Sequence, residues 1–142
     1  MPAETPKPDP VVIAAYLDDV DEELKVAKRL SEAPPSRFAA FHLQQAAEKL
    51  VKAVRLHRGL FASTEHNIRA LIEELPADDA WRAKLSPLGV LSAYATTFRY
   101  PSPAGKRKPG LSQQETLEWT ETMSALVGEL RAIIATKPLR DR

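Results

Sequence analysis

Hydrophobic residues recur at three- and four-residue steps through most of the chain, which is the spacing of helices that bury one face. The first such run starts at Pro10, where Asp9 is suited to be the N-cap and proline to be the first helical residue. It is expected to end at Pro34–Pro35, because the residue before a proline disfavours the α region. Its apolar positions are Ile13, Tyr16, Leu17, Val20, Leu24, Ala27 and Leu30.

A second run has the widest apolar surface in the chain and is expected to be the central element of a bundle or a dimer interface. It starts after Ser36, a candidate N-cap, and ends near Arg58–Gly59. Because helical residues advance about 100° each, His42, Gln45 and Lys49 form a polar stripe at the edge of its apolar face. Polar groups at such a boundary need partners in another helix, another subunit or a ligand.

The rest of the chain predicts shorter elements and one more long helix. The shorter elements are a helix over 65–75 capped by Ser63 or Thr64, a turn from Asp78 or Asp79 through Trp81, and a helix from Ser86 with a break near Pro87. A loop is expected over 101–110. The last long helix is expected from the Ser112–Glu115 capping box to about Thr136. No segment shows sustained period-2 alternation, so no strand is predicted. The predicted fold is all-α, an antiparallel up-down four-helix bundle with an additional short helix.

Length and composition fit a single helical domain. The 142 residues suffice for one hydrophobic core, with a tail expected over 1–9, a bundle over 10–137 and a second tail over 138–142. The absence of cysteine excludes disulfides and thiolate chemistry. The N-terminus lacks the apolar segment of a signal peptide, and no apolar run approaches the ~20 residues of a membrane span. A cytoplasmic protein without membrane association is therefore expected.

The charge balance gives no general attraction to nucleic acid, because 20 basic and 19 acidic side chains leave a net charge of +1. Nucleic-acid binding would need a local patch. The run Lys106–Arg107–Lys108 is such a patch, although short basic runs in loops are usually only solvated. Whether the chain binds nucleic acid stays open at this point.

The three histidines are candidates for chemistry, and each also has a structural interpretation. His42 lies in the polar stripe, His57 lies near the carbonyl end of the second helix where a cation is favourable, and His66 lies in the first turn of the third. Because no His-Glu-x-x-His motif and no glycine-rich phosphate loop occur, neither a metal site nor a cofactor is predicted. Glu48 and Lys52 are interpreted as a solvated i, i+4 pair on the outer face of the second helix.

Arg99 and Tyr100 form the strongest candidate for ligand recognition. An arginine near a helix end can cap carbonyls, but its planar guanidinium is equally suited to phosphate, with Tyr100 as a stacking surface for a base. The candidate ligand-binding set is therefore Arg99, Tyr100, His42, Gln45, Lys49 and His66.

Three separated motifs follow one another along the chain. They are His42-x-Gln-Gln-Ala-Ala-Glu-Lys-x-x-Lys-Ala with Gly59 after it, His66-Asn-Ile, and Tyr94-Ala-Thr-x-x-Arg99-Tyr-Pro. In this order the motifs resemble the HEPN domain family of small nucleotide-binding helical proteins, over roughly residues 10 to 136. The resemblance implies a helical bundle of a kind that commonly dimerises. A dimer is also expected because the apolar faces of the second and last helices look wider than one bundle can cover. The residues behind that expectation are Phe38, Phe41, Leu50, Val54, Trp119 and Leu130.

The resemblance also bears on catalysis. Family members that cut RNA carry an arginine followed after about four to six residues by a histidine, whereas Arg99 is followed there by Ala104, Gly105 and Lys106. The chain therefore resembles the non-nuclease branch, which is associated with nucleotide binding and with small nucleotidyltransferase partners. The leading hypothesis is a non-catalytic, homodimeric module that binds a nucleotide or phosphate, one form of which is an accessory subunit of a small nucleotidyltransferase. The alternatives are a toxin-type ribonuclease with an atypical active site, using His42 or His66 as base, and a purely structural dimeric interaction protein.

Overall fold

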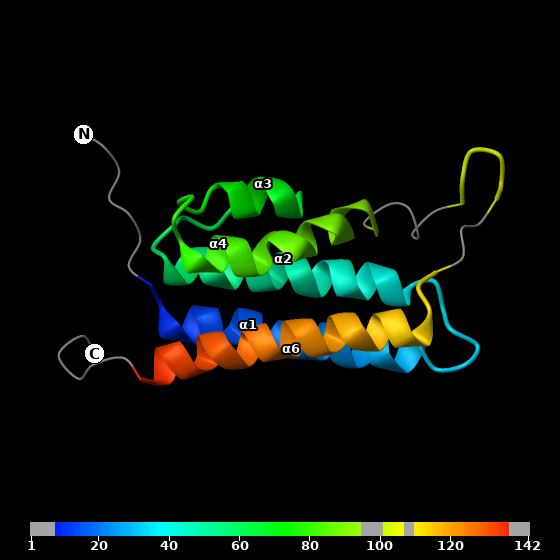
Figure 1. Ribbon diagram of the computed structural model, residues 1–142, viewed down its shortest axis with the longest axis horizontal. Helices are drawn as coiled ribbons and strands as arrows, with labels where there is room; N and C mark the ends of the chain where they lie inside the picture. Colours follow the sequence, from blue (N-terminus) through cyan, green and yellow to red (C-terminus); the bar gives the residue numbers. More distant parts are fainter. Residues whose placement is uncertain (1–7, 95–100, 107–109, 137–142) are drawn as a thin grey trace.

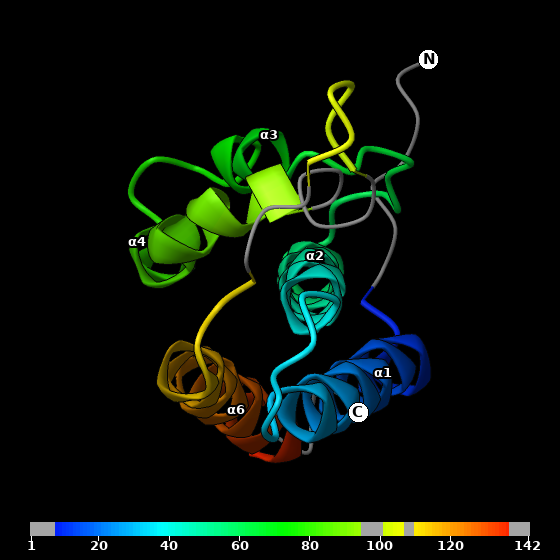
Figure 2. The same cartoon turned by 90° about the vertical axis from the view of Figure 1, so that its right-hand side faces the viewer.

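Three long helices dominate the computed structural model, which describes residues 8–94, 101–106 and 110–136 (Figure 1). The elements are α1 (Pro10–Leu30), α2 (Ala39–His57), α3 (Ile68–Glu73), α4 (Ala80–Leu85), the 3-10 helix η1 (Ser86–Ala93) and α6 (Gln113–Ala135). Seen end-on, α2 lies in the middle, with α1 and α6 on one side and the α3, α4 and η1 segments on the other (Figure 2). The prediction that the second helix is the central element is confirmed.

The central position of α2 explains its composition. Its neighbours are α1, α6, α3 and η1, so side chains on nearly every side of it are buried. Alanines at the contacts let the helices approach, and leucines and valines fill the space between them. By contrast, α1 buries a single stripe, as its sequence pattern predicts: Ile13, Leu17, Val20, Leu24 and Ala27. Truncating a fully buried leucine such as Leu50 is expected to cost about 2–5 kcal/mol.

Several helix ends form as the sequence predicts. The Asp9 carboxylate accepts hydrogen bonds from the backbone N–H groups of Val11 and Val12, and Pro10 is the first residue of α1. Ser112 and Glu115 form a complete capping box at α6, with both bonds at 3.1 Å. Gly59 leaves α2 with a φ of 78°, a left-handed conformation that glycine adopts without strain.

Two predicted caps are wrong, for local reasons. Ser36 belongs to the turn after α1, because its N–H donates to the Leu30 carbonyl at 2.7 Å, and α2 begins only at Ala39 without a side-chain cap. Ser63 accepts from the Glu65 N–H instead of capping α3. The cap of α3 is Asn67, whose side chain accepts from the Ala70 N–H at 3.2 Å.

The fourth helical element of the bundle consists of two consecutive helices, α4 and η1. Asp79 caps α4, and η1 follows it directly, with Pro87 near its start. Proline lacks the N–H needed to continue an α-helix, so the break predicted near Pro87 is realised as a change to 3-10 geometry. The short additional helix is α3. The all-α bundle is thus confirmed, and the described segments contain no strand. None of the helices in these segments is both long and apolar enough to span a membrane.

Candidate functional site

A connected set of polar side chains lies on the side of α2 that faces α3 and η1. The side-chain NH₂ of Gln45 donates to the side-chain amide oxygen of Gln44 at 2.8 Å, and the side-chain NH₂ of Gln44 donates to Oε1 of Glu48 at 3.3 Å. The other carboxylate oxygen of Glu48 lies 3.4 Å from the Lys52 ammonium and 3.1 Å from Nδ1 of His66. We call these five residues the Glu48 network. It runs from the interior of the bundle to a solvent-exposed imidazole.

Glu48 is the buried centre of this network. Only 6% of the residue is exposed, so the prediction of a solvated pair on the outer face of α2 is wrong. The reason is tertiary: α3 and η1 cover this side of α2, and no local pattern in α2 specifies that cover. A buried carboxylate is tolerated only where donors and a counter-charge surround it. Gln44, Lys52 and His66 supply them here.

His66 reaches Glu48 from the segment that links α2 to α3, and local contacts hold it there. The Glu65 carboxylate accepts from the N–H groups of His66 and Asn67, at 3.0 and 2.9 Å. The Ile68 N–H donates to the Ser92 hydroxyl of η1 at 2.9 Å, while the Ile68 side chain is fully buried. The imidazole is nevertheless 78% exposed. Its position is therefore fixed on one edge and open to solvent on the other.

The structure does not join His42 and Lys49 to this network. Nδ1 of His42 lies 3.4 Å from a Glu23 carboxylate oxygen on α1, within ion-pair range but without hydrogen-bond alignment. Lys49 lies 3.7 Å from Asp19 and 4.0 Å from Glu23, also on α1. Only Gln45 of the predicted stripe belongs to the Glu48 network. The partners of His42 and Lys49 are thus supplied by the neighbouring helix, one of the three possibilities that the sequence left open.

Arg99 and Tyr100 lie outside the described residues, as do Arg107 and Lys108 of the basic run. Lys106 is described and is exposed. Tyr94, the last described residue before this gap, is partly buried against the core. Burial raises the pKa of its phenol, and the nearby Glu115 carboxylate raises it further. Roles for Arg99 and Tyr100 in ligand binding stay predictions from the sequence.

A second buried charge on α2, Arg55, is absent from the site residues that the sequence predicts. Its side chain is 5% exposed and pairs with Glu74 at 2.8 Å. Its guanidinium also donates to the carbonyls of Leu71 and Phe61, at 3.5 and 3.4 Å. The signal in the sequence is a row of polar residues at four- and three-residue steps, namely Gln44, Glu48, Lys52 and Arg55. Such a row is typical of a solvated face. The structure shows instead that Gln44, Glu48 and Arg55 are buried.

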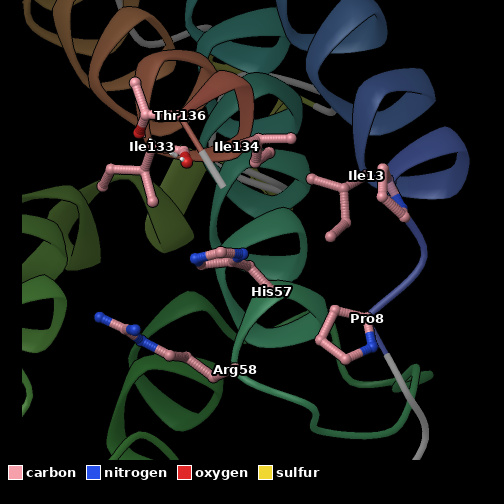
Figure 3. Close-up of a pocket in the computed structure, with 8 residues that line it drawn as sticks. Pro8, Ile13, His57, Arg58, Ile133, Ile134 and Thr136 are labelled. Carbon is pink, nitrogen blue, oxygen red and sulfur yellow. Dashed lines mark hydrogen bonds between the residues drawn. The ribbon is translucent and has the colours of Figure 1, made fainter. Parts of the chain in front are cut away.

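A separate pocket of about 500 Å³ lies where the ends of α1, α2 and α6 meet (Figure 3). Ile13, Ile133 and Ile134 form its apolar wall, and its polar lining comes from His57, Arg58 and Thr136. Arg58 is engaged elsewhere, because its guanidinium makes a bidentate contact with Asp79 at 2.8 and 3.0 Å. The pocket therefore offers mostly apolar surface.

The Asp79 carboxylate at the edge of this region has a shifted pKa. Partial burial raises it, but the hydrogen bond from the Trp81 N–H and the contact with Arg58 outweigh burial and lower the pKa overall. Asp79 thus both caps α4 and holds the end of α2. No group of three potential metal ligands occurs in the described segments.

Comparison with known proteins places this geometry in context. The HEPN domain model matches residues 14–133. The crystal structure of TT1696 from Thermus thermophilus is similar to this fold, with a TM-score of 0.64 and 26% sequence identity. The similarity covers 82% of this chain and 93% of that chain. A comparison with curated proteins returned no match. The region matched by the family model takes in most of each long helix and the Glu48 network.

Proposed function

Because this chain belongs to the HEPN domain family, we propose that it is a non-catalytic module that binds a nucleotide or phosphate, as accessory subunit of a small nucleotidyltransferase. The observation that carries the proposal is the Glu48 network, which holds an exposed imidazole in a fixed position on a buried carboxylate. Gln45, at its other end, is half-buried and offers an amide group at the surface.

A role in stability alone accounts poorly for this network. Replacing a buried ion pair by apolar residues is often neutral or stabilising, so a bundle that only had to fold would gain little from Glu48 and Lys52. Lys49 and His42 already pair with Asp19 and Glu23 of α1, so contacts that relate α1 to α2 exist without the Glu48 network.

The sequence adds a second part to the proposed site. Arg99 would hold a phosphate through its planar fork and Tyr100 would stack on a base. Lys106, Arg107 and Lys108 would only attract the ligand over a longer range. Arg99 and Tyr100 come soon after η1 in the chain, and η1 is anchored beside His66 by the Ser92 hydroxyl.

Calorimetric titration with ATP and AMP tests nucleotide binding. We expect the wild-type protein to bind at least one of them below millimolar concentration. His66→Ala should weaken that binding, whereas Lys25→Ala should not, because Lys25 is 72% exposed on α1 and pairs only loosely with Glu22 at 3.9 Å. If neither nucleotide binds the wild-type protein, the module is not a nucleotide-binding one.

The partner and the homodimer are separate parts of the proposal. Purification from the native cell, with mass spectrometry of bound protein, should recover a nucleotidyltransferase. Light scattering at micromolar concentration should give the mass of two chains. The sequence argument for a dimer needs revision, because Leu50, Val54 and Leu130 are fully buried within one chain. Phe38 is the member of that set with a substantially exposed side chain, at 42%.

A ribonuclease of toxin type is the second candidate, and one observation favours it. A carboxylate behind one imidazole nitrogen leaves the other nitrogen to act as a general base. In this reaction His66 would take the proton of a ribose 2′-hydroxyl, whose oxygen would attack the adjacent phosphorus. The 5′-oxygen of the next nucleotide would leave and take a proton from solvent. His42 is less suited, because its side chain is only 27% exposed.

An RNA cleavage assay without metal decides between the two candidates. Our proposal expects no cleavage above that of the Arg99→Ala and His66→Ala variants. Cleavage that is present in the wild-type protein and lost in both variants would show that the chain is a nuclease.

A further inference from the structure

The hydrogen-bond donors around Glu48 determine which nitrogen of His66 carries the proton. Gln44 donates to one carboxylate oxygen, and Lys52 and His66 meet the other. Glu48 pairs with the Lys52 ammonium as a carboxylate, and an ionised carboxylate only accepts hydrogen bonds. Nδ1 of His66, 3.1 Å away, must therefore be the donor. In the neutral imidazole this leaves Nε2 as a hydrogen-bond acceptor.

The hydrogen bonds at the other end of the Glu48 network also run from donor to acceptor toward Glu48. The Gln45 side chain uses its NH₂ group to donate to Gln44, so its carbonyl oxygen remains an acceptor. Within the described part of the chain, this oxygen and Nε2 of His66 make no hydrogen bond. The N–H groups that connect Gln45, Gln44 and His66 thus point along the network toward Glu48. Nε2 of His66 is left as an acceptor, whereas Gln45 keeps its amide oxygen and one N–H of its NH₂ group.

We propose that His66 accepts a hydrogen bond through Nε2 from a neutral donor group of the ligand, a sugar hydroxyl or an exocyclic amine, and does not bind the phosphate. This inference rests on the proposed nucleotide-binding function and assigns one part of the ligand to one atom. A phosphate oxygen is itself an acceptor and would face an acceptor at Nε2. A contact between phosphate and Nε2 would require the imidazolium form, in which both ring nitrogens are donors.

The rigid placement of His66 makes this selection effective. The Glu65 carboxylate, the Asn67 cap and the buried Ile68 fix the backbone on both sides of the imidazole. A fixed acceptor loses little conformational freedom when a ligand binds, so the contact contributes most of its hydrogen-bond energy. A ligand that lacks the matching donor would leave Nε2 with water only.

The tautomer can be tested without any ligand. The chain contains three histidines, so nitrogen NMR of protein labelled at histidine, assigned with a His66→Ala variant, isolates the His66 signals. At pH 8 we expect the Nδ1–H form in the wild-type protein, with the second nitrogen unprotonated. The Glu48→Gln variant should shift the His66 population toward the other tautomer, because a carboxamide can donate to Nδ1. A wild-type Nε2–H tautomer would overturn the inference even if nucleotides bind.

The ligand group can be tested by removing donors one at a time. Calorimetric titrations at pH 8 would compare AMP with 2′-deoxy-AMP, 3′-deoxy-AMP and inosine monophosphate, the last of which lacks the exocyclic amine. Loss of the recognised donor should weaken binding about three- to tenfold in the wild-type protein and less than about twofold in His66→Ala, as expected for a single neutral hydrogen bond. If the affected nucleotide is a deoxy-AMP, His66 recognises a sugar hydroxyl. If it is inosine monophosphate, His66 recognises the exocyclic amine.

Inorganic pyrophosphate and a control variant complete the experiment. His66→Ala should leave pyrophosphate binding unchanged, and Lys25→Ala should leave every titration unchanged. Loss of pyrophosphate binding in His66→Ala, or equal weakening of all four nucleotides, would overturn the inference while leaving the nucleotide-binding proposal intact. If the wild-type protein binds none of the nucleotides, both fail together.

Discussion

The ion pair between Arg55 and Glu74 leads to an asymmetric prediction about stability. Arg55 on α2 is 5% exposed at its side chain, whereas the Glu74 side chain is 51% exposed at the end of α3. Removing the carboxylate leaves a guanidinium buried without its counter-charge. Removing the guanidinium leaves a carboxylate that water can solvate. The exposed partner should therefore be the more costly one to lose.

The magnitudes follow from these exposures. Breaking a buried pair by deleting one partner costs about 3–5 kcal/mol, and the carbonyls of Leu71 and Phe61 still bind Arg55, so we expect about 2–3 kcal/mol for Glu74→Ala. For Arg55→Met the methionine fills most of the volume, and the two lost carbonyl contacts are long, at 3.5 and 3.4 Å. We expect about 1 kcal/mol for this change.

Urea unfolding followed by far-ultraviolet circular dichroism would measure these free energies of unfolding. The double variant Arg55→Met/Glu74→Ala should be more stable than Glu74→Ala alone, since the unpaired buried charge is gone. Glu73→Ala is the matched control, because Glu73 is a neighbouring exposed glutamate on α3. If Arg55→Met proves costlier than Glu74→Ala, or if the double variant is the least stable, the burial argument is refuted.

Three further predictions concern the helix ends and the basic loop. Ser112→Ala should destabilise α6 by about 1 kcal/mol in thermal unfolding, and a value near zero would mean that the capping box is dispensable. The pKa of Asp79 is lowered in the folded state, so the ionised carboxylate stabilises the fold above the ordinary pKa of 3.8, and this stabilisation is lost as pH falls through the folded pKa. The difference in free energy of unfolding between wild-type and Asp79→Asn should therefore shrink in that acidic range and stay constant near neutral pH. Neutralising Lys106, Arg107 and Lys108 together should weaken ATP binding mainly at low salt, whereas Arg99→Lys should weaken it at all salt concentrations.

The long helices can be predicted because each buries its own periodic face or carries its own cap. The stripe of α1 and the capping box of α6 are local patterns, and the structure reproduces both. The central role of α2 is also predictable, because a helix that is apolar on most sides must be covered on most sides. Asn67 is missed as a cap because Ser63 and Thr64 are equally good cap residues a few positions earlier.

The candidate site is predictable only in part. The sequence identifies Gln45 as a polar group in need of a partner and His66 as a candidate for ligand binding. It favours a solvated Glu48, because a Glu–Lys pair at i, i+4 is usually solvated. The burial of Glu48 depends on where α3 and η1 pack. Such contacts between distant segments cannot be read from the spacing of hydrophobic and polar residues within α2. His42 and Lys49 find their partners on α1 instead, where Asp19 and Glu23 lie within ion-pair range.

The two buried charges of α2 connect the stability of the fold to the shape of the proposed site. Glu48 binds His66, and Arg55 binds the Phe61 and Leu71 carbonyls and Glu74, so opposite charges two turns apart hold one continuous segment from residue 61 to residue 74. Loosening this segment at Arg55 should let His66 move away from Glu48, although Arg55 makes no contact with His66. Arg55→Met is therefore expected to lower the Nδ1–H population of His66 in nitrogen NMR, while Glu73→Ala leaves it unchanged. An unaltered His66 signal in a clearly destabilised Arg55→Met protein would show that the two charges act independently, and that the site depends on Glu48 and the Ser92 anchor alone.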